Sequence, residues 1–256
     1  YQRRFCVDVI CRMMRLSYWD RVNQVVPEDF RKLLPVKPHH QPLPESNLGT
    51  SEDLEGIWSA KALDLIRKKT SDEQLDEWMK SNALEAVLGG KVNLSKMLLR
   101  ALLVAGQKSY SHMIIALERY YGPLAVLVSE GGEDAQIAAI ETVWQVWSGN
   151  SQRAAMAIDR MMTLRLVSAN SVVRWVFESG TIKGTGDQKK YNLGWEALFN
   201  AVDKTVARVE DVSHDIEMLS SAHNSTDNGT LRAKKELLIE CENQRMATFY
   251  LAIQNF

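Results

Sequence analysis

Cysteine is scarce in this chain, and its placement excludes several classes of protein. The three cysteines among 256 residues are Cys6, Cys11 and Cys241. Small secreted domains held together by disulfides use more cysteines, and structural zinc sites usually contain CxxC pairs, which are absent here. We therefore expect no disulfide framework, no zinc site and a reducing compartment, the nucleus or the cytosol.

An excess of one charge and long apolar runs are also missing. Lysine and arginine total 31 and aspartate and glutamate 32, so the formal net charge is −1. Proteins that grip a phosphate backbone over a long footprint are usually basic, so we do not expect this chain alone to bind nucleic acid non-specifically. No apolar run approaches the roughly 20 residues of a membrane-spanning helix.

Proline is nearly confined to one region. Five of the six prolines are Pro27, Pro35, Pro38, Pro42 and Pro44. Proline lacks an amide hydrogen and disfavours helix before it, so residues 35–50 are predicted to form an extended, proline-rich connector. Residues 1–34, with predicted helices over 3–16 and 28–34, would end a preceding helical domain. Residues 51–256 would form an incomplete last helical-repeat domain, because the chain begins and ends inside helical patterns and is expected to be a fragment.

Apolar residues recur at helical spacing after the connector, between short polar joints. Helices are predicted over 53–69, 71–81, 93–106, 110–128, 133–148, 151–166, 169–179, 190–221 and 230–256. Ser71 with Gln74, or Thr70 with Glu73, could form a capping box. Even the valine-rich stretch 172–177 fits a short buried helix better than a strand. The pattern predicts an all-α fold, an α-solenoid of antiparallel helix pairs of a degenerate HEAT-like type.

The last part of the chain has a different apolar rhythm. Alternating steps of three and four join Trp195, Leu198, Val202, Thr205, Val209, Val212, Ile216 and Leu219. Such spacing is typical of coiled coils. A polar, turn-rich stretch over 220–230 and a second charged helix follow. We interpret residues 195–256 as a long coiled helical hairpin; a dimerising coiled coil is the alternative, which the turn-rich tip disfavours.

Motifs of enzymes and metal sites are absent. The sequence has no phosphate-binding loop, GxSxG elbow, HExxH motif or acidic DDxxD cluster. His39 and His40 lie in the connector without further ligands nearby. His112 could be a general base or a buried polar group that joins helices, and the lack of a nucleophile favours the structural role. We predict no catalytic, cofactor-binding or metal-ligating residue.

A few aromatic and basic residues are candidates for partner contacts. Trp144, Trp147, Trp175 and Trp195 share helix faces with isoleucine and valine, so they are expected in the core. One ring of the Tyr120–Tyr121 pair should pack while the other reaches the surface. Arg153, Arg160, Arg165 and Arg174 fall on successive predicted helices, as a basic stripe or simply as solvated residues. The candidate interface residues are Tyr120, Arg160, Arg165 and Arg174.

Two stretches, 108–128 and 139–177, carry a family resemblance. The first contains Ser109-Tyr110-Ser111-His112. The second contains Val146-Trp147, Asn150, Asp159-Arg160-Met161 and Trp175-Val176-Phe177, in this order. With the Trp195 helix that leads into a charged hairpin, these stretches resemble the large-subunit family of the nuclear cap-binding complex. The similarity is most specific over 108–205.

The resemblance implies a fold similar to the middle domain of initiation factor 4G and a scaffold role without catalysis or cofactor. In that family the large subunit stabilises a small subunit whose RNA-recognition motif binds the 7-methylguanosine cap of pre-mRNA. It also recruits splicing, export and decay factors. A nuclear protein that shuttles to the cytoplasm, touches capped RNA through its partner and has no membrane contact is therefore expected.

Two other classes stay open at this point. A related cytoplasmic helical scaffold of translation initiation or nonsense-mediated decay would share the same fold. An all-α enzyme is the third class, and the missing acidic metal motif disfavours it.

Overall fold

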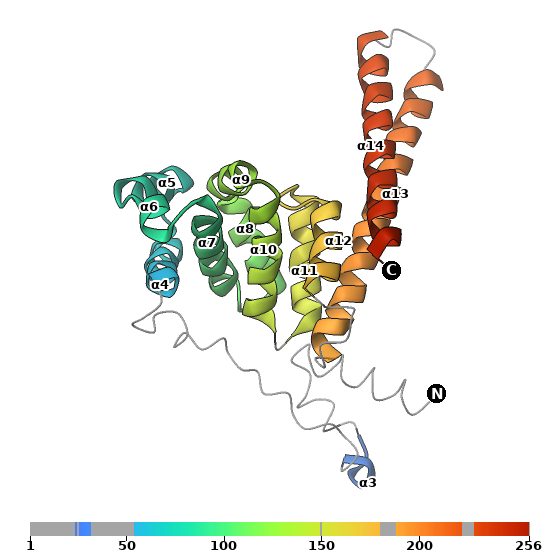
Figure 1. The fold of residues 1–256 in the computed structure, drawn as a ribbon. Coiled ribbons are helices and arrows are strands. Elements are labelled where there is room, and N and C mark those ends of the chain that lie inside the picture. The colour runs from blue at the N-terminus through green and yellow to red at the C-terminus, as the bar shows by residue number, and fades with distance from the viewer. Residues whose placement is uncertain are drawn as a thin grey trace. The chain divides into compact units, whose positions relative to one another are not determined.

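All regular secondary structure described in this chain is α-helical (Figure 1). The computed structural model describes residues 24, 26–31, 54–148, 150–179, 188–221 and 228–255. The chain divides into two units, Tyr1–Pro42 and Leu43–Phe256. In the first, α3 (Glu28–Arg31) falls within the helix predicted over 28–34. The predicted helix over 3–16 and the connector over 35–50, with its histidine pair, lie outside the described residues, so they stay predictions.

The second unit is a series of helices that pack on near neighbours in the sequence. They are α4 (Leu54–Arg67), α5 (Asp72–Ser81), α6 (Leu84–Leu88), α7 (Lys91–Ala105), α8 (Tyr110–Arg119), α9 (Tyr121–Glu130), α10 (Gly132–Trp147), α11 (Ser151–Thr163), α12 (Ala169–Glu178), α13 (Gln188–Ser221) and α14 (Asn228–Asn255). α4 packs on α7, α7 on α10, α10 on α11 and α12, and these two on α13. The all-α stacked-helix prediction is confirmed.

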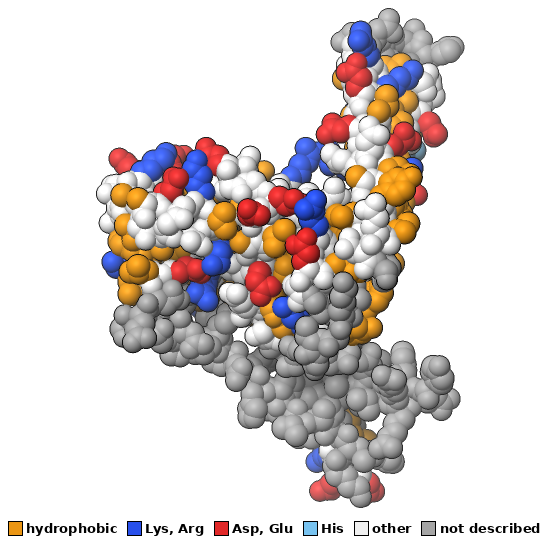
Figure 2. Space-filling view, viewed as in Figure 1, with side chains coloured by type: hydrophobic (Ala, Val, Ile, Leu, Met, Phe, Trp, Pro, Cys, Tyr) orange, Lys and Arg blue, Asp and Glu red, His pale blue; other side chains and the backbone are white. Residues whose placement is uncertain are grey.

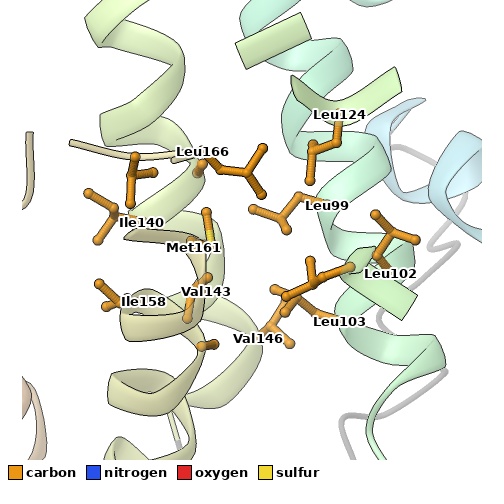
Figure 3. Close-up of a cluster of buried hydrophobic side chains, with 14 of the residues drawn as sticks. Leu99, Leu102, Leu103, Leu124, Ile140, Val143, Val146, Ile158, Met161 and Leu166 are labelled. Carbon is orange, nitrogen blue, oxygen red and sulfur yellow. The ribbon is translucent and has the colours of Figure 1, made fainter. Parts of the chain in front are cut away.

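Helix α7 lies at the centre of this packing. It contacts α4, α6, α8, α9 and α10. Leu98, Leu99, Ala101, Leu102 and Leu103 are all fully buried, so apolar contacts surround the helix instead of forming a single stripe. Figure 3 shows Leu99 and Leu103 on the side of α7 that faces Val143 and Val146 of α10 and Met161 of α11, with Leu124 of α9 and Leu166 nearby and Leu102 farther from them.

One of the two capping boxes expected near residue 71 is present. The backbone N–H of Gln74 donates to Ser71 Oγ at 3.2 Å, and the backbone N–H of Ser71 donates to Gln74 Oε1 at 3.3 Å. The Thr70–Glu73 alternative is wrong, because the Thr70 hydroxyl donates to the Leu65 carbonyl at 2.9 Å and helps to close α4. The reciprocal bonds satisfy amides that a helix start otherwise leaves unpaired.

The structure corrects the prediction of one helix over 110–128. The helix ends at Arg119, and a second begins at Tyr121, with Tyr120 between them at φ −109° and ψ 26°. Pro123 gives the physical reason, since it has no amide hydrogen for the carbonyl of residue 119 and its ring would clash there. The short helix α6 was also missed, because its five residues are too few to show a period.

The expected helical hairpin is formed by α13 and α14. Near its base, Leu193, Ala197 and Ala201 are buried with the main core. Farther along, Val209, Val212 and Cys241 form a separate cluster with Ile216, Leu237 and Leu238. Trp195 departs from the predicted stripe: it is 38% exposed and meets Tyr191 edge-on, because the neighbouring Leu198 and Ala197 take the buried positions.

Truncating a buried side chain of α7 should destabilise the whole unit. We expect Leu103→Ala to lower the free energy of unfolding by about 2 to 5 kcal/mol, because it leaves a cavity among side chains with no exposed surface. Urea unfolding followed by circular dichroism measures the change. Ile115→Ala, at a side chain that is 61% exposed, is the control and should change it little. Equal losses in the two variants would contradict the central position of α7.

Candidate functional site

The described residues contain no cluster suited to metal binding. Within them, no three His, Cys, Asp or Glu side chains lie close enough together to hold a metal ion. The Ser109–His112 pair is a helix cap: the His112 amide donates to Ser109 Oγ at 3.2 Å, and His112 Nδ1 lies 2.6 Å from the same oxygen. His112 is exposed, so the expected buried polar group between helices is wrong. The pair satisfies the first turn of α8.

Tyr120, the first of the four candidate interface residues, is buried and only 1% exposed. Its hydroxyl donates to the Thr70 carbonyl at 2.6 Å, and the adjacent Arg119 donates to the Lys69 carbonyl at 2.7 Å. Burial raises the pKa of the Tyr120 phenol. The side chain thus ties the α8–α9 junction to the end of α4, and its ring is not available to a partner. Tyr121, 38% exposed, is the surface ring of the pair.

Arg160 and Arg174 each pair with a glutamate from an earlier helix. Arg160 on α11 forms a salt bridge with Glu118 on α8. Arg174 on α12 lies 3.1 Å from Glu133 on α10, and both side chains are more than two-fifths exposed. These pairs connect helices that are neighbours in the stack. The exposed Arg174–Glu133 pair contributes little to stability, on the order of 0 to 1 kcal/mol.

Arg165 differs from the other candidate arginines. It is exposed, it lies in the turn between α11 and α12, and no ion pair to another described residue involves it. Its backbone has φ 59°, in the left-handed region that is uncommon for residues other than glycine. The turn therefore presents a cation to solvent at the α11–α12 joint.

The predicted basic stripe is interrupted at Arg153. The guanidinium of Arg153 donates to the Gln107 carbonyl at 2.6 Å and lies 4.6 Å from the centre of the Trp147 ring. Burial lowers the pKa of this arginine. Since Arg153, Arg160 and Arg174 all make contacts within the unit, the four arginines do not form a continuous free cationic surface.

A polar contact between α10 and α12 was missed at the sequence level. The indole Nε1 of Trp175, a side chain only 1% exposed, donates to Glu141 at 2.8 Å, and Lys190 lies 3.9 Å from the same carboxylate oxygen. Trp175 lies in the core, as its spacing predicts. Its polar partner carries no sequence signal, because residues 34 positions apart meet only through packing.

The base of the hairpin exposes large apolar side chains, visible as orange surface near α13 and α14 in Figure 2. Phe199 and Ile253 are each 68% exposed, and Tyr250 is 60% exposed. Apolar surface exposed over a contiguous area marks contact surfaces in many proteins. The sequence does contain a signal for this surface, which the coiled-coil interpretation overlooked. Tyr191, Trp195 and Phe199 are aromatic and follow one another at intervals of about one helical turn.

The described helices thus define the class: an α-solenoid of stacked helices that ends in a helical hairpin. None of these helices is long and apolar enough to cross a lipid bilayer. Residues 59–256 match the family described as MIF4G like, and the chain belongs to this family.

The similarity of this chain to individual proteins is more specific than the family match. The chain is 30% identical over 240 residues to a protein of Arabidopsis thaliana named nuclear cap-binding protein subunit 1, covering 92% of this chain. Proteins of the same name from Oryza sativa subsp. japonica and Aedes aegypti are 31% identical over 240 residues and 27% identical over 222 residues, covering 92% and 83% of this chain. These similarities confirm the resemblance predicted from residues 108–205. The chain spans only 27%, 27% and 26% of the respective relatives.

The Tyr120–Thr70 contact has a testable pH dependence. Tyr120→Phe should lower the free energy of unfolding at pH about 7 by about 1 kcal/mol, because the Thr70 carbonyl loses its donor. The raised pKa stabilises the folded protein below the ordinary tyrosine pKa of about 10, and this stability is lost as pH rises through the higher folded-state pKa. Urea unfolding at pH about 7 and about 10.5 measures both effects.

The variant should therefore lose less stability on going to alkaline pH than the unsubstituted chain. Tyr121→Phe, at the exposed ring, is the matched control and should leave the alkaline loss unchanged. If Tyr120→Phe and Tyr121→Phe gave the same pH dependence, the assigned role of Tyr120 would be wrong.

Proposed function

We propose that this chain is part of a non-enzymatic scaffold subunit of the nuclear cap-binding complex. The observation that carries the proposal is the 30% and 31% identity, over 92% of the chain, to plant proteins named nuclear cap-binding protein subunit 1. The MIF4G-like match over residues 59–256 is consistent with a helical scaffold. In this proposal the protein acts in the nucleus and shuttles to the cytoplasm.

The role suits the physical character of the unit. A stack of helices with a continuous core keeps its surface in one shape, so it can order mobile loops of a partner at low entropic cost. The partner would be a small subunit with an RNA-recognition motif, and its aromatic rings, not those of this chain, would hold the 7-methylguanosine cap. Other surfaces of the scaffold would recruit splicing, export and decay factors. The near-neutral charge agrees with indirect contact to RNA.

A related cytoplasmic scaffold of translation initiation or nonsense-mediated decay is the second candidate. The observation that favours it is the MIF4G-like match itself, since a helical domain of this kind does not specify a cap-binding partner.

Copurification separates the two candidates. We expect the tagged full-length protein that contains this chain to copurify with a small RNA-recognition-motif protein. It should be retained on 7-methylguanosine resin only when that partner is present, because the cap-stacking rings belong to the partner. Retention on cap resin without a partner would contradict the proposal. A bound DEAD-box helicase in place of a small cap-binding protein would favour the cytoplasmic scaffold.

Among the candidate interface residues, we propose Arg165 as the one most available to a partner, since Arg160 and Arg174 already pair with glutamates. Arg165→Glu should weaken binding of the small subunit by roughly tenfold, the effect of losing one favourable charge contact and gaining a repulsive one. Surface plasmon resonance with the copurified partner measures this affinity. Lys235→Glu, at an exposed lysine on α14, makes the same change in charge and should leave the affinity unchanged. Equal losses in both variants would indicate a general charge effect and contradict a contact at Arg165.

A further inference from the structure

An open groove of about 940 Å³ lies between α5, α6, the start of α7 and α9. Figure 1 shows α5, α6 and α9 at the same side of the unit. The buried side chains of Met79, Leu84, Leu94 and Leu127 contribute to the groove, and Val126, 55% exposed, lies along it. The volume is at the upper end of the range for ligand-binding pockets, and the apolar lining offers a place for an aliphatic side chain.

Acidic side chains dominate the charged lining of the groove. The lining contains the carboxylates of Asp72, Glu73, Asp76, Glu85 and Glu130, and Lys80 is its one lysine. Lys80 is already paired with Asp76 at 2.6 Å, and Lys91 is paired with Glu130 at 2.9 Å. No salt bridge within the described part of the chain involves Asp72, Glu73 or Glu85. The groove therefore combines an apolar lining with three carboxylates that lack a salt-bridge partner.

The walls of the groove are held in place by contacts within the unit. The Ser71–Gln74 capping box fixes the start of α5. The Lys91–Glu130 pair joins the start of α7 to the end of α9. Between α5 and α7 the backbone turns sharply, with Ala83, Gly89 and Gly90 all at positive φ. A groove held in this way needs little rearrangement to accept a ligand, which lowers the entropic cost of binding.

We propose that this groove binds a basic peptide segment that carries an aliphatic anchor residue. The anchor would pack against Val126 and the accessible edge of Leu127, and flanking lysine or arginine side chains would pair with Asp72, Glu73 and Glu85. Charge complementarity selects this occupant, because an acidic peptide would meet like charges along the lining. The groove is built from this chain alone, so the inference holds independently of the cap-complex role.

Selection from a display library of random dodecapeptides on the immobilised full chain tests the proposal. We expect the enriched peptides to contain lysine or arginine next to a leucine, isoleucine or valine. Fluorescence anisotropy with a labelled enriched peptide should show affinity that falls as NaCl rises from about 50 to about 300 mM, since the paired charges are partly exposed. Absence of any enriched peptide, or enrichment of acidic or uncharged peptides, would overturn the proposal.

Two pairs of variants locate the binding. Val126→Arg narrows the groove and adds a repelling charge at an exposed position, so the peptide affinity should fall at least about tenfold. Ile253→Arg makes the same kind of change on the exposed surface of α14 and should leave the affinity unchanged. The double variant Glu73→Gln, Glu85→Gln should bind the peptide more weakly and with a smaller salt dependence. The double variant Glu210→Gln, Glu242→Gln on the hairpin should change neither property.

Circular dichroism melting of each variant confirms that it is folded before its affinity is compared. Should Val126→Arg fail to fold, the glutamine pair gives the same test without adding bulk. Peptide binding that is equal in the groove variants and in the hairpin controls would overturn the assignment.

Discussion

The burial of α7 on several sides is the constraint on which the rest of the unit depends. Leu98 with Leu102, Leu99 with Leu103, and Met97 with Ala101 lie on three successive sides of the helix and are all fully buried, so no single neighbour can cover them. Burying each leucine contributes about 1.5 to 3 kcal/mol, which makes an uncovered side costly. α4, α6, α8, α9 and α10 supply the cover. Their positions around α7 in turn set where the acidic groove and the inter-helix ion pairs can form.

Polar contacts at the edges of the stack determine what is left for partners. Glu141 accepts from the Trp175 indole, Glu133 pairs with Arg174, and Glu118 pairs with Arg160. Buried polar groups need such partners, and most half-exposed charges here have found one within the unit. The remaining surface differs along the chain: carboxylates of α5 and α6 lie there without a salt bridge to another described residue, and apolar side chains are exposed at the base of the hairpin. The net charge of −1 gives no indication of this difference between the two surfaces.

Most helices could be predicted because their signals are local. The valine-rich helix α12 and the Ser71–Gln74 capping box follow from spacing and residue type over a few positions. The break at Tyr120 was also encoded locally, in Pro123, but the apolar rhythm on both sides concealed it. Trp195 was misplaced for a different reason: at the base of the hairpin, α13 also packs on α11 and α12, which an isolated coiled-coil pattern does not anticipate.

The sequence by itself determined that the chain is all-α, that its helices stack and that a long hairpin closes the described part, since helical periodicity and turn residues act over short distances. Its resemblance to cap-binding large subunits was likewise readable from residues 108–205. Only the tertiary structure decided that Tyr120 is buried, that Arg165 is exposed without an ion pair to another described residue, and that carboxylates from Asp72 to Glu130 line one groove. Those outcomes depend on which helix faces meet, and packing between distant segments settles that.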